Sequence, residues 1–397
     1  MTVLTPGDEA QLAEVVAGAA AAGTPLEIRG GGTRAGVGRP VQASRTLSTA
    51  GLSGITLYEP EALTLVVKAG TPVAEIEAAL AAEGQMLAFE PMDHRALLGA
   101  QGEPTIGGVV ACGVSGPRRI QAGACRDAML GVRFVNGRGE AVKSGGRVMK
   151  NVTGYDLVKL MCGSHGTLGV LSEISFKVLP KPERAISLVI EGLDDAAAVA
   201  VLGQAMTSPF DVTGAAHVPA GEAGEGARTV VRVEGMARQG AYRAGELARI
   251  LARHGTVERL EGAAHEALWR EIRDVAPFAG RSGAVWRLSL KPSDAPAAVA
   301  AIRATLARTA LDCSVLYDWA GGLVWLLTAE TGDAGAGAIR RETAARGGHA
   351  TLVRASAATR AAVEVFEPEP ETLARIAVGL RAKFDPAGIL NPGRMRG

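Results

Sequence analysis

Three consecutive glycines followed by a threonine are the first residues whose types and spacing could do chemistry: Gly30, Gly31, Gly32 and Thr33. They come directly after residues 25–29, a short segment predicted to be a strand. Backbone N–H groups without neighbouring side chains can approach an anion closely, so the segment could hold a pyrophosphate. The residues that follow contain too much glycine and proline for the helix that a Rossmann site needs. From this segment alone, a flexible surface turn is the alternative.

A second glycine-rich segment, residues 99–123, keeps neither helical nor strand periodicity. It is therefore predicted to be a loop that faces a ligand. Its small residues would let a flat ring system lie against the backbone, and Thr105 and Ser115 offer hydroxyl groups as hydrogen-bond partners. A buried glycine-rich packing loop is the alternative.

The composition excludes several classes of protein. The 397 residues include 42 Lys and Arg against 41 Asp and Glu, which gives no electrostatic sign of a nucleic-acid partner or of direct binding to an acidic membrane. The four cysteines form no C-x-x-C pair and the six histidines are scattered, so no metal or iron–sulfur site is predicted. No apolar stretch is long enough to span a bilayer, and the first residues do not resemble a signal peptide. We expect a cytoplasmic protein.

Both helices and strands are predicted around these glycines. Residues 1–182 alternate short strands with helices and end at Pro180 and Pro182. Residues 183–370 contain two passes of a β-α-β-β-α-β pattern, which predicts an antiparallel sheet backed by helices. Residues 371–397 begin with a helix and end in a structured loop. The predicted fold class is α+β.

Seven segments together resemble the FAD-binding oxidoreductases of the vanillyl-alcohol oxidase/p-cresol methylhydroxylase type: residues 29–33, 67–71, 105–108, 123–127, 150–160, 163–170 and 384–394. The resemblance implies a two-part FAD-binding domain of the PCMH type at 1–182 and a smaller α+β cap at 183–370. It also implies that residues 371–397 return to the FAD domain. Within the family, the short cap and residues 89–92, 216–217 and 348–354 look like the FAD-binding subunits of glycolate oxidases.

This resemblance also implies which residues bind FAD: Arg29, Gly30, Gly31, Gly32, Thr33, Pro91, Thr105, Ile106, Gly107, Gly108, Gly113, Ser115, Gly116, Gly169, Val170 and Asn391. Members that hold FAD covalently commonly have a histidine where this chain has Thr33. The resemblance therefore implies non-covalent FAD.

The implied function is that of an FAD-binding subunit in a multisubunit glycolate oxidase. Such a subunit would relay electrons between a catalytic flavin subunit and an iron–sulfur subunit, and would meet a membrane only through its partners. Two alternatives stay open: a self-sufficient dehydrogenase of a small 2-hydroxy acid, and a non-catalytic flavin-binding scaffold.

The sequence assigns no catalytic residue. His217 and His349 lie on predicted cap strands, which in the family can face the flavin, and either could serve a self-sufficient dehydrogenase as the base. Arg232, Arg287 and Arg354 also lie on predicted strands and could clamp a carboxylate, although an arginine on a strand usually points to solvent.

Overall fold

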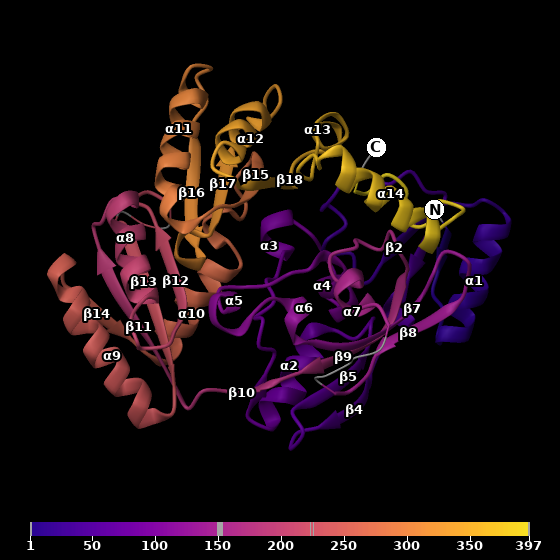
Figure 1. The fold of residues 1–397 in the computed structure, drawn as a ribbon, viewed down its shortest axis with the longest axis horizontal. Coiled ribbons are helices and arrows are strands. Elements are labelled where there is room, and N and C mark those ends of the chain that lie inside the picture. Colours follow the sequence, from indigo (N-terminus) through magenta and orange to yellow (C-terminus); the bar gives the residue numbers. More distant parts are fainter. Residues whose placement is uncertain (1, 149–153, 223, 225, 396–397) are drawn as a thin grey trace.

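The computed structural model describes residues 2–148, 154–222, 224 and 226–395. Two large antiparallel sheets dominate the fold, and they are built by successive halves of the chain (Figure 1). This arrangement confirms the predicted α+β class.

A small parallel sheet and one helix open the chain. The strand order in this sheet is β1-β3-β2, and its strands are β1 (Thr2–Leu4), β2 (Leu26–Arg29) and β3 (Arg45–Ser48). Helix α1 (Glu9–Ala21) begins at the N-cap Asp8, whose carboxylate accepts a hydrogen bond from the Gln11 N–H. Its residues Leu12 and Val16 are fully buried against this sheet. The sheet thereby fixes the end of β2, where the three glycines begin.

A five-stranded antiparallel sheet forms the rest of the first half. Its order is β4-β5-β9-β7-β8, from β4 (Ile55–Glu59), β5 (Thr64–Lys68), β7 (Met129–Val135), β8 (Ala141–Gly145) and β9 (Val170–Lys177). Two short strands pair beside it, β6 (Gln85–Met86) and β10 (Leu179–Pro180). The helices of this half are α2 (Val73–Ala82), α3 (Arg95–Leu98), α4 (Ile106–Cys112), α5 (Arg119–Ala122), α6 (Cys125–Ala128) and α7 (Leu157–Met161).

Helix α4 corrects one prediction, because residues 99–123 were expected to form a loop. The side chain of Thr105 caps the helix by accepting a hydrogen bond from the Gly108 N–H. A Cβ atom on Gly107 would lie 2.7 Å from the carbonyl oxygen of Ala69, so glycine lets this helix pack directly on backbone. Tertiary packing thus overrides the low helix propensity of glycine.

Part of one sequence motif lies outside the described residues. The motif at 150–160 begins within residues 149–153. The described remainder forms α7, whose N-cap is Asp156.

The second half forms an eight-stranded antiparallel sheet, as predicted. Its order is β14-β11-β13-β12-β16-β17-β15-β18. The strands are β11 (Arg184–Glu191), β12 (Val212–Val218), β13 (Arg228–Gly235), β14 (Val257–Leu260), β15 (Ala284–Ser289), β16 (Cys313–Asp318), β17 (Leu323–Thr328) and β18 (His349–Arg354). The helices are α8 (Asp195–Met206), α9 (Ala237–Leu251), α10 (Gly262–Arg273), α11 (Ala295–Ala307) and α12 (Ala336–Ala344).

The two faces of this sheet have different neighbours. Helices α8, α9, α11 and α12 cover the outer face (Figure 1), and apolar residues such as Trp286 and Val231 pack beneath them. The inner face shares one apolar core with the first half, to which Val230 and Trp325 belong. Because successive strand residues point to opposite faces, the register of each strand decides which polar side chains meet the FAD-binding half.

The tail returns to the first half. After α13 (Ala357–Ala362) and α14 (Glu371–Phe384), the chain pairs with β2 through a bridge between Leu390 and Leu26. No residue of α14 is buried, and the side chains of Leu373 and Ile376 lie in solvent. Among the described residues, no helix is both long and apolar enough to cross a membrane.

Candidate functional site

A cavity of about 740 Å³, part of it open to solvent, lies where β2, α4 and the C-terminal tail meet. Ten of the residues predicted to bind FAD line it: Arg29, Gly30, Gly31, Gly32, Thr33, Thr105, Gly107, Gly108, Gly169 and Asn391. They come from segments as far apart in the chain as Arg29 and Asn391, and the fold brings them to one place.

The glycines of this cradle are required by close backbone contacts. A Cβ atom on Gly31 would lie 1.7 Å from the carbonyl oxygen of Glu103, and one on Gly30 would lie 2.1 Å from Oγ1 of Thr105. Gly32 has φ of +78°, a backbone conformation that favours glycine. Side chains at these positions would push the β2 loop away from α4 and change the shape of the cavity.

Positive charge lines the cavity, and none of the lining residues is acidic. Arg29 and Arg394 are both paired with Glu27, at 2.7 and 3.2 Å. Buried Arg34 donates from Nη2 to the carbonyl oxygen of Met92 at 3.0 Å, but its Nε has no hydrogen-bond partner in the part of the chain that the structure describes. A buried cation with an unused donor is costly unless an anion binds beside it.

The tail closes the cavity through Asn391. Its Oδ1 accepts a hydrogen bond from the Ile28 N–H at 2.8 Å, and its Nδ2 donates to the carbonyl oxygen of His165 at 2.8 Å. Both Asn391 and His165 have positive φ, at 44° and 51°. These two strained residues hold the tail against β2 and the segment before β9.

These features fit the diphosphate of FAD. Glycine backbone provides close approach, Arg34 provides an unpaired cation, and no lining carboxylate would repel the phosphates. Thr33, at the position of the covalent histidine in other members, is buried in the lining.

Six predicted residues do not line this cavity: Pro91, Ile106, Gly113, Ser115, Gly116 and Val170. As flavin contacts they remain predictions. Ile106 and Val170 are fully buried in apolar cores, and Pro91 lines a separate hollow between the two halves.

The other three of these residues shape the loop after α4. Gly113 ends the helix in the left-handed conformation, with φ of 62°. The hydroxyl of Ser115 accepts a hydrogen bond from the Cys125 N–H at 2.9 Å. The carbonyl oxygen of Gly116 accepts one from the indole Nε1 of Trp319 at 3.0 Å, which joins this loop to the cap.

Sequence reasoning gave no FAD-binding role to several lining residues, among them Arg34, His165, Gly166 and Arg394. Arg34 follows the glycines directly, so its position next to the predicted cradle was an available signal. His165 lies in the segment 163–170 that carries the family resemblance, but its own contact with the cavity depends on the approach of the segment before β9.

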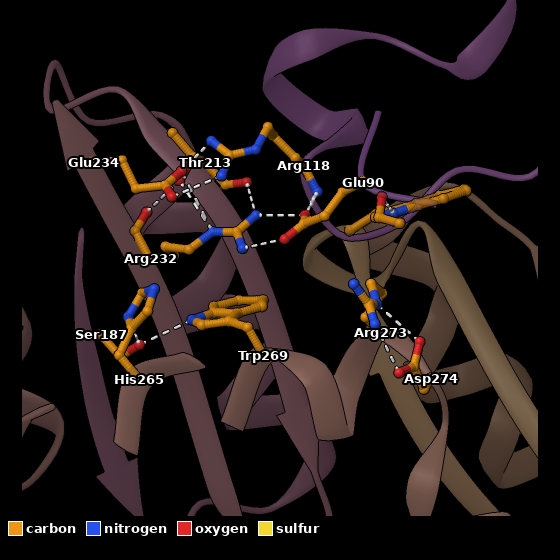
Figure 2. A network of polar contacts seen from close by, with 12 residues as sticks. Glu90, Arg118, Ser187, Thr213, Arg232, Glu234, His265, Trp269, Arg273 and Asp274 are labelled. Carbon is orange, nitrogen blue, oxygen red and sulfur yellow. Dashed lines mark hydrogen bonds and ion pairs between the residues drawn. The ribbon is translucent and has the colours of Figure 1, made fainter. Parts of the chain in front are cut away.

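In the separate hollow that Pro91 lines, an ion-pair network joins the two halves (Figure 2). Arg232 of β13 makes a bidentate pair with Glu90, with distances of 2.8 and 2.9 Å. Arg118 pairs in the same way with Glu234, and its backbone N–H donates to Glu90 at 2.9 Å. Burial would raise the pKa of Glu90, but Arg232 and Arg118 outweigh it and lower this pKa to about 2. Arg232 is therefore saturated by carboxylates and is not free to clamp a ligand.

Arg354 is also occupied. Its guanidinium donates to four backbone carbonyl oxygens, those of Leu97, Phe278, Arg281 and Gly283, at 2.7 to 3.2 Å. It ties β18 to α3 and to the segment before β15. Of the three strand arginines that sequence reasoning considered, only Arg287 has a side chain without a hydrogen bond or ion pair to the described residues.

The two candidate histidines lie on opposite faces of the cap sheet. His217 is fully buried on the outer face, where its Nδ1 lies 3.0 Å from Oγ1 of Thr229 and its Nε2 lies 3.5 Å from Oδ1 of Asp195 on α8. It cannot face a flavin, because the alternation of β12 directs it toward the helices. His349 is exposed as a residue, but its imidazole is partly shielded from solvent. This partial desolvation and the nearby Arg287 both lower the pKa of His349.

Comparison with known proteins gives the family. Residues 2–145 match the family described as "FAD binding domain". Glycolate oxidase subunit GlcE of Escherichia coli (strain K12) is 37% identical over 376 residues, which cover 94% of this chain and 93% of that protein. This chain belongs to the GlcE family of glycolate oxidase subunits. It is thus an FAD-dependent oxidoreductase subunit with an FAD-binding domain.

More distant similarities include another glycolate oxidase subunit and solved structures that share the fold. Glycolate oxidase subunit GlcD of Bacillus subtilis (strain 168) is 28% identical over 49% of this chain and 41% of that protein. The crystal structure of p-cresol methylhydroxylase with substrate bound has a TM-score of 0.73 at 15% identity, over 99% of this chain and 88% of that chain. Alkyldihydroxyacetonephosphate synthase has a TM-score of 0.73 at 16% identity, over 98% and 76%. These two structures confirm the PCMH-type fold.

Proposed function

We propose that this chain holds FAD non-covalently and serves as an electron-transferring subunit of an enzyme complex that oxidises glycolate to glyoxylate. The observation that carries the proposal is the cavity between β2, α4 and the tail, with its glycine backbone and the unpaired donor of Arg34. The similarity to the GlcE subunit over nearly the whole chain supports the choice of glycolate.

Each part of the cavity has a role in this proposal. Bound FAD would supply a two-electron acceptor and donor. Arg34 would offset the charge of the diphosphate, while the N–H groups of Gly30 to Gly32 approach it from the β2 loop. Asn391 would hold the tail in place and so limit access of water to the cavity. Thr33 offers no nucleophile comparable to histidine, which supports dissociable FAD.

The partners in this proposal are a catalytic flavin subunit and an iron–sulfur subunit. The oxidation of glycolate releases two electrons and two protons, and this chain would pass the electrons from the first partner to the second. Across its described residues, no group of His, Cys, Asp and Glu side chains could hold a metal ion. Any contact of the complex with a membrane would be made through partners.

A second candidate function is oxidation of a small 2-hydroxy acid by this chain alone. Arg287 favours it, because an arginine without a carboxylate partner on the inner face of the cap sheet could receive the substrate's carboxylate. His349 could then accept the proton of the substrate's hydroxyl group.

The visible absorption spectrum of the purified chain tests these proposals. We expect oxidised flavin near one per chain, released into the supernatant by acid precipitation of the protein. Anaerobic glycolate should leave this spectrum unchanged, and the flavin should become reduced only after the partner subunits are added. Bleaching by glycolate alone would replace the relay function with the second candidate. Protein that cannot take up FAD would contradict both, and flavin that stays with the precipitate would contradict non-covalent binding.

A further inference from the structure

Helix α14 carries an apolar stripe that faces solvent. Leu373, Ile376 and Leu380 follow one another at intervals of three and four residues, so they lie along one side of the helix. Leu373 is 53% exposed, Ile376 is 54% exposed and Leu380 is half-buried. A surface helix normally turns such a stripe toward the core of its own protein. The rest of the described chain leaves this stripe uncovered, and exposed apolar patches often mark interaction sites.

The contacts of α14 within the described chain give it little stability. None of its residues is buried, and its N-cap residue, Pro370, supplies no side-chain hydrogen bond. Figure 1 shows the helix at the periphery of the molecule, outside the two large sheets. Isolated helices shorter than about 12–15 residues are marginal in water, and helices in proteins owe most of their stability to the packing of an apolar face. We therefore expect this helix of 14 residues to pack against a second protein surface.

The C-terminal end of α14 is fixed to the FAD-binding half. The carbonyl oxygen of Phe384 accepts a hydrogen bond from the Gly137 N–H at 2.8 Å, and its ring centroid lies 6.0 Å from that of Phe134. After a short turn, Asn391 holds the tail against β2 at the FAD cavity. A protein that binds the stripe would therefore lie on the segment that leads directly into the closure of this cavity.

The charges of α14 indicate which kind of surface the stripe fits. Arg375, Arg381 and Lys383 are cationic, and residues 372–384 include no acid. None of these three side chains has a hydrogen bond or ion pair with any residue that the structure describes. Lys383 lies about two helical turns after Ile376 and so borders the stripe. In a symmetric pair of copies the same surface would meet itself and bring these cations together. The stripe thus fits a different protein, whose apolar surface is bordered by carboxylates.

We propose that the stripe of α14, with Arg375 and Lys383 beside it, is the docking surface for another subunit of the enzyme complex. That subunit binds it through an apolar groove bordered by acidic side chains. Docking buries Leu373 and Ile376 and pairs the free cations with carboxylates. The inference rests on the proposed function for the identity of the partner as a subunit of the complex, and it adds the surface through which this partner binds.

Assembly of the complex tests the docking surface. The complex is purified through an affinity tag on this chain after co-expression with the other subunits, and its dissociation constant is measured by dilution and mass photometry. Leu373→Ser/Ile376→Ser should raise this constant about tenfold or more, because it removes apolar groups that the interface buries. Tyr242→Ser is the matched control, since Tyr242 is a large side chain on α9 that is 64% exposed. The control should assemble like the unchanged chain.

The charged border of the stripe is tested in the same assay. Arg375→Glu/Lys383→Glu should also weaken assembly, because it places carboxylates against those of the partner. The unchanged complex should weaken as salt screens the ion pairs, whereas the charge-reversed variant should not. Arg308→Glu, which changes an exposed arginine at the end of α11, is the control. Equal assembly of the charge-reversed variant and this control would contradict a partner with an acidic border.

The melting temperature, flavin content and molar mass of each chain alone complete the test. Leu373→Ser/Ile376→Ser should match the unchanged chain in all three, since both side chains lie in solvent. A lower melting temperature, or assembly equal to that of the unchanged chain, would overturn the docking surface. So would a dimer of the chain alone, or binding to vesicles of phosphatidylglycerol, that this variant abolishes, because the occupant would then be a second copy or a membrane. A chain that assembles through α14 but takes up no FAD would contradict the proposed function and leave this surface standing.

Discussion

Arg34 is the residue on which we expect the affinity for FAD to depend most. It lies buried in the cavity lining with one donor unused, whereas Arg29 and Arg394 are both paired with Glu27. Arg34→Ala should raise the dissociation constant of FAD by about tenfold or more, because a hydrogen bond to a charged group contributes about 1.5–3 kcal/mol. Titration of the apoprotein with FAD, followed by flavin fluorescence, measures this dissociation constant. Arg308→Ala serves as the control, and equal affinities of these two variants would contradict the role of Arg34.

Asp318 is a second single residue with a testable effect, because it makes the free energy of unfolding depend on pH. Burial raises its pKa to about 7, whereas an unfolded aspartate titrates near pH 4. Between these values the folded chain binds more protons than the unfolded chain, so this residue makes stability fall as the pH rises from about 4 to 7. Asp318→Asn keeps an acceptor for the Trp319 N–H and removes the titration. The variant should therefore be the more stable protein at pH 8, by at most about 4 kcal/mol, and should lose this advantage near pH 4. Urea unfolding at both pH values measures the difference in free energy of unfolding between the variant and the unchanged chain. A difference that does not change with pH would contradict the raised pKa of Asp318.

At the scale of elements, the contact between the β2 loop and the segment before α4 sets the shape of the FAD cavity. Gly31 packs so closely on Glu103 that the Cβ atom of an alanine would lie 1.7 Å from its carbonyl oxygen. Gly31→Ala must displace one of the two segments, so we expect loss of most FAD binding and a lower melting temperature. Gly36→Ala is a matched control, since a Cβ atom there would meet nothing within 4 Å and its φ is not positive. If the two variants held flavin equally, the close contact would not matter for the cradle.

At the scale of the whole molecule, the pair between Glu90 and Arg232 joins the two halves across their interface. Because the pKa of Glu90 is lowered to about 2, its contribution to stability is present above about pH 4.5 and is lost as the pH falls toward 2. Glu90→Gln at pH 7 should cost about 3–5 kcal/mol, the usual effect of leaving a buried charge unpaired. Glu261→Gln, which breaks the exposed pair with Arg184, should cost at most about 1 kcal/mol.

A double-mutant cycle separates this pair from simple loss of packing. The combined variant Glu90→Gln/Arg232→Gln should cost less than the sum of the two single variants, because it leaves neither charge unpaired. Unfolding in urea, followed by circular dichroism, gives the four free energies. Additive effects would show that Glu90 and Arg232 are not coupled across the interface.

The sequence by itself predicted the features that depend on residues adjacent in the chain. Runs such as Gly30 to Gly32 determine where backbone can approach a ligand, and alternating apolar residues determine the antiparallel cap sheet. The helix α4 escaped this reading because burial against Ala69, rather than its own residues, stabilises it.

Only the tertiary structure decided which polar side chains are free to act. Arg232 and Arg287 both lie on predicted strands, but Glu90 neutralises the first, whereas no carboxylate among the described residues pairs with the second. His217 turned to the outer face of its sheet, since a shift of one residue in a strand reverses the face. The physical reason is that charge pairing and burial depend on partners more than a hundred residues away, whereas the shape of a glycine loop depends largely on the residues within it.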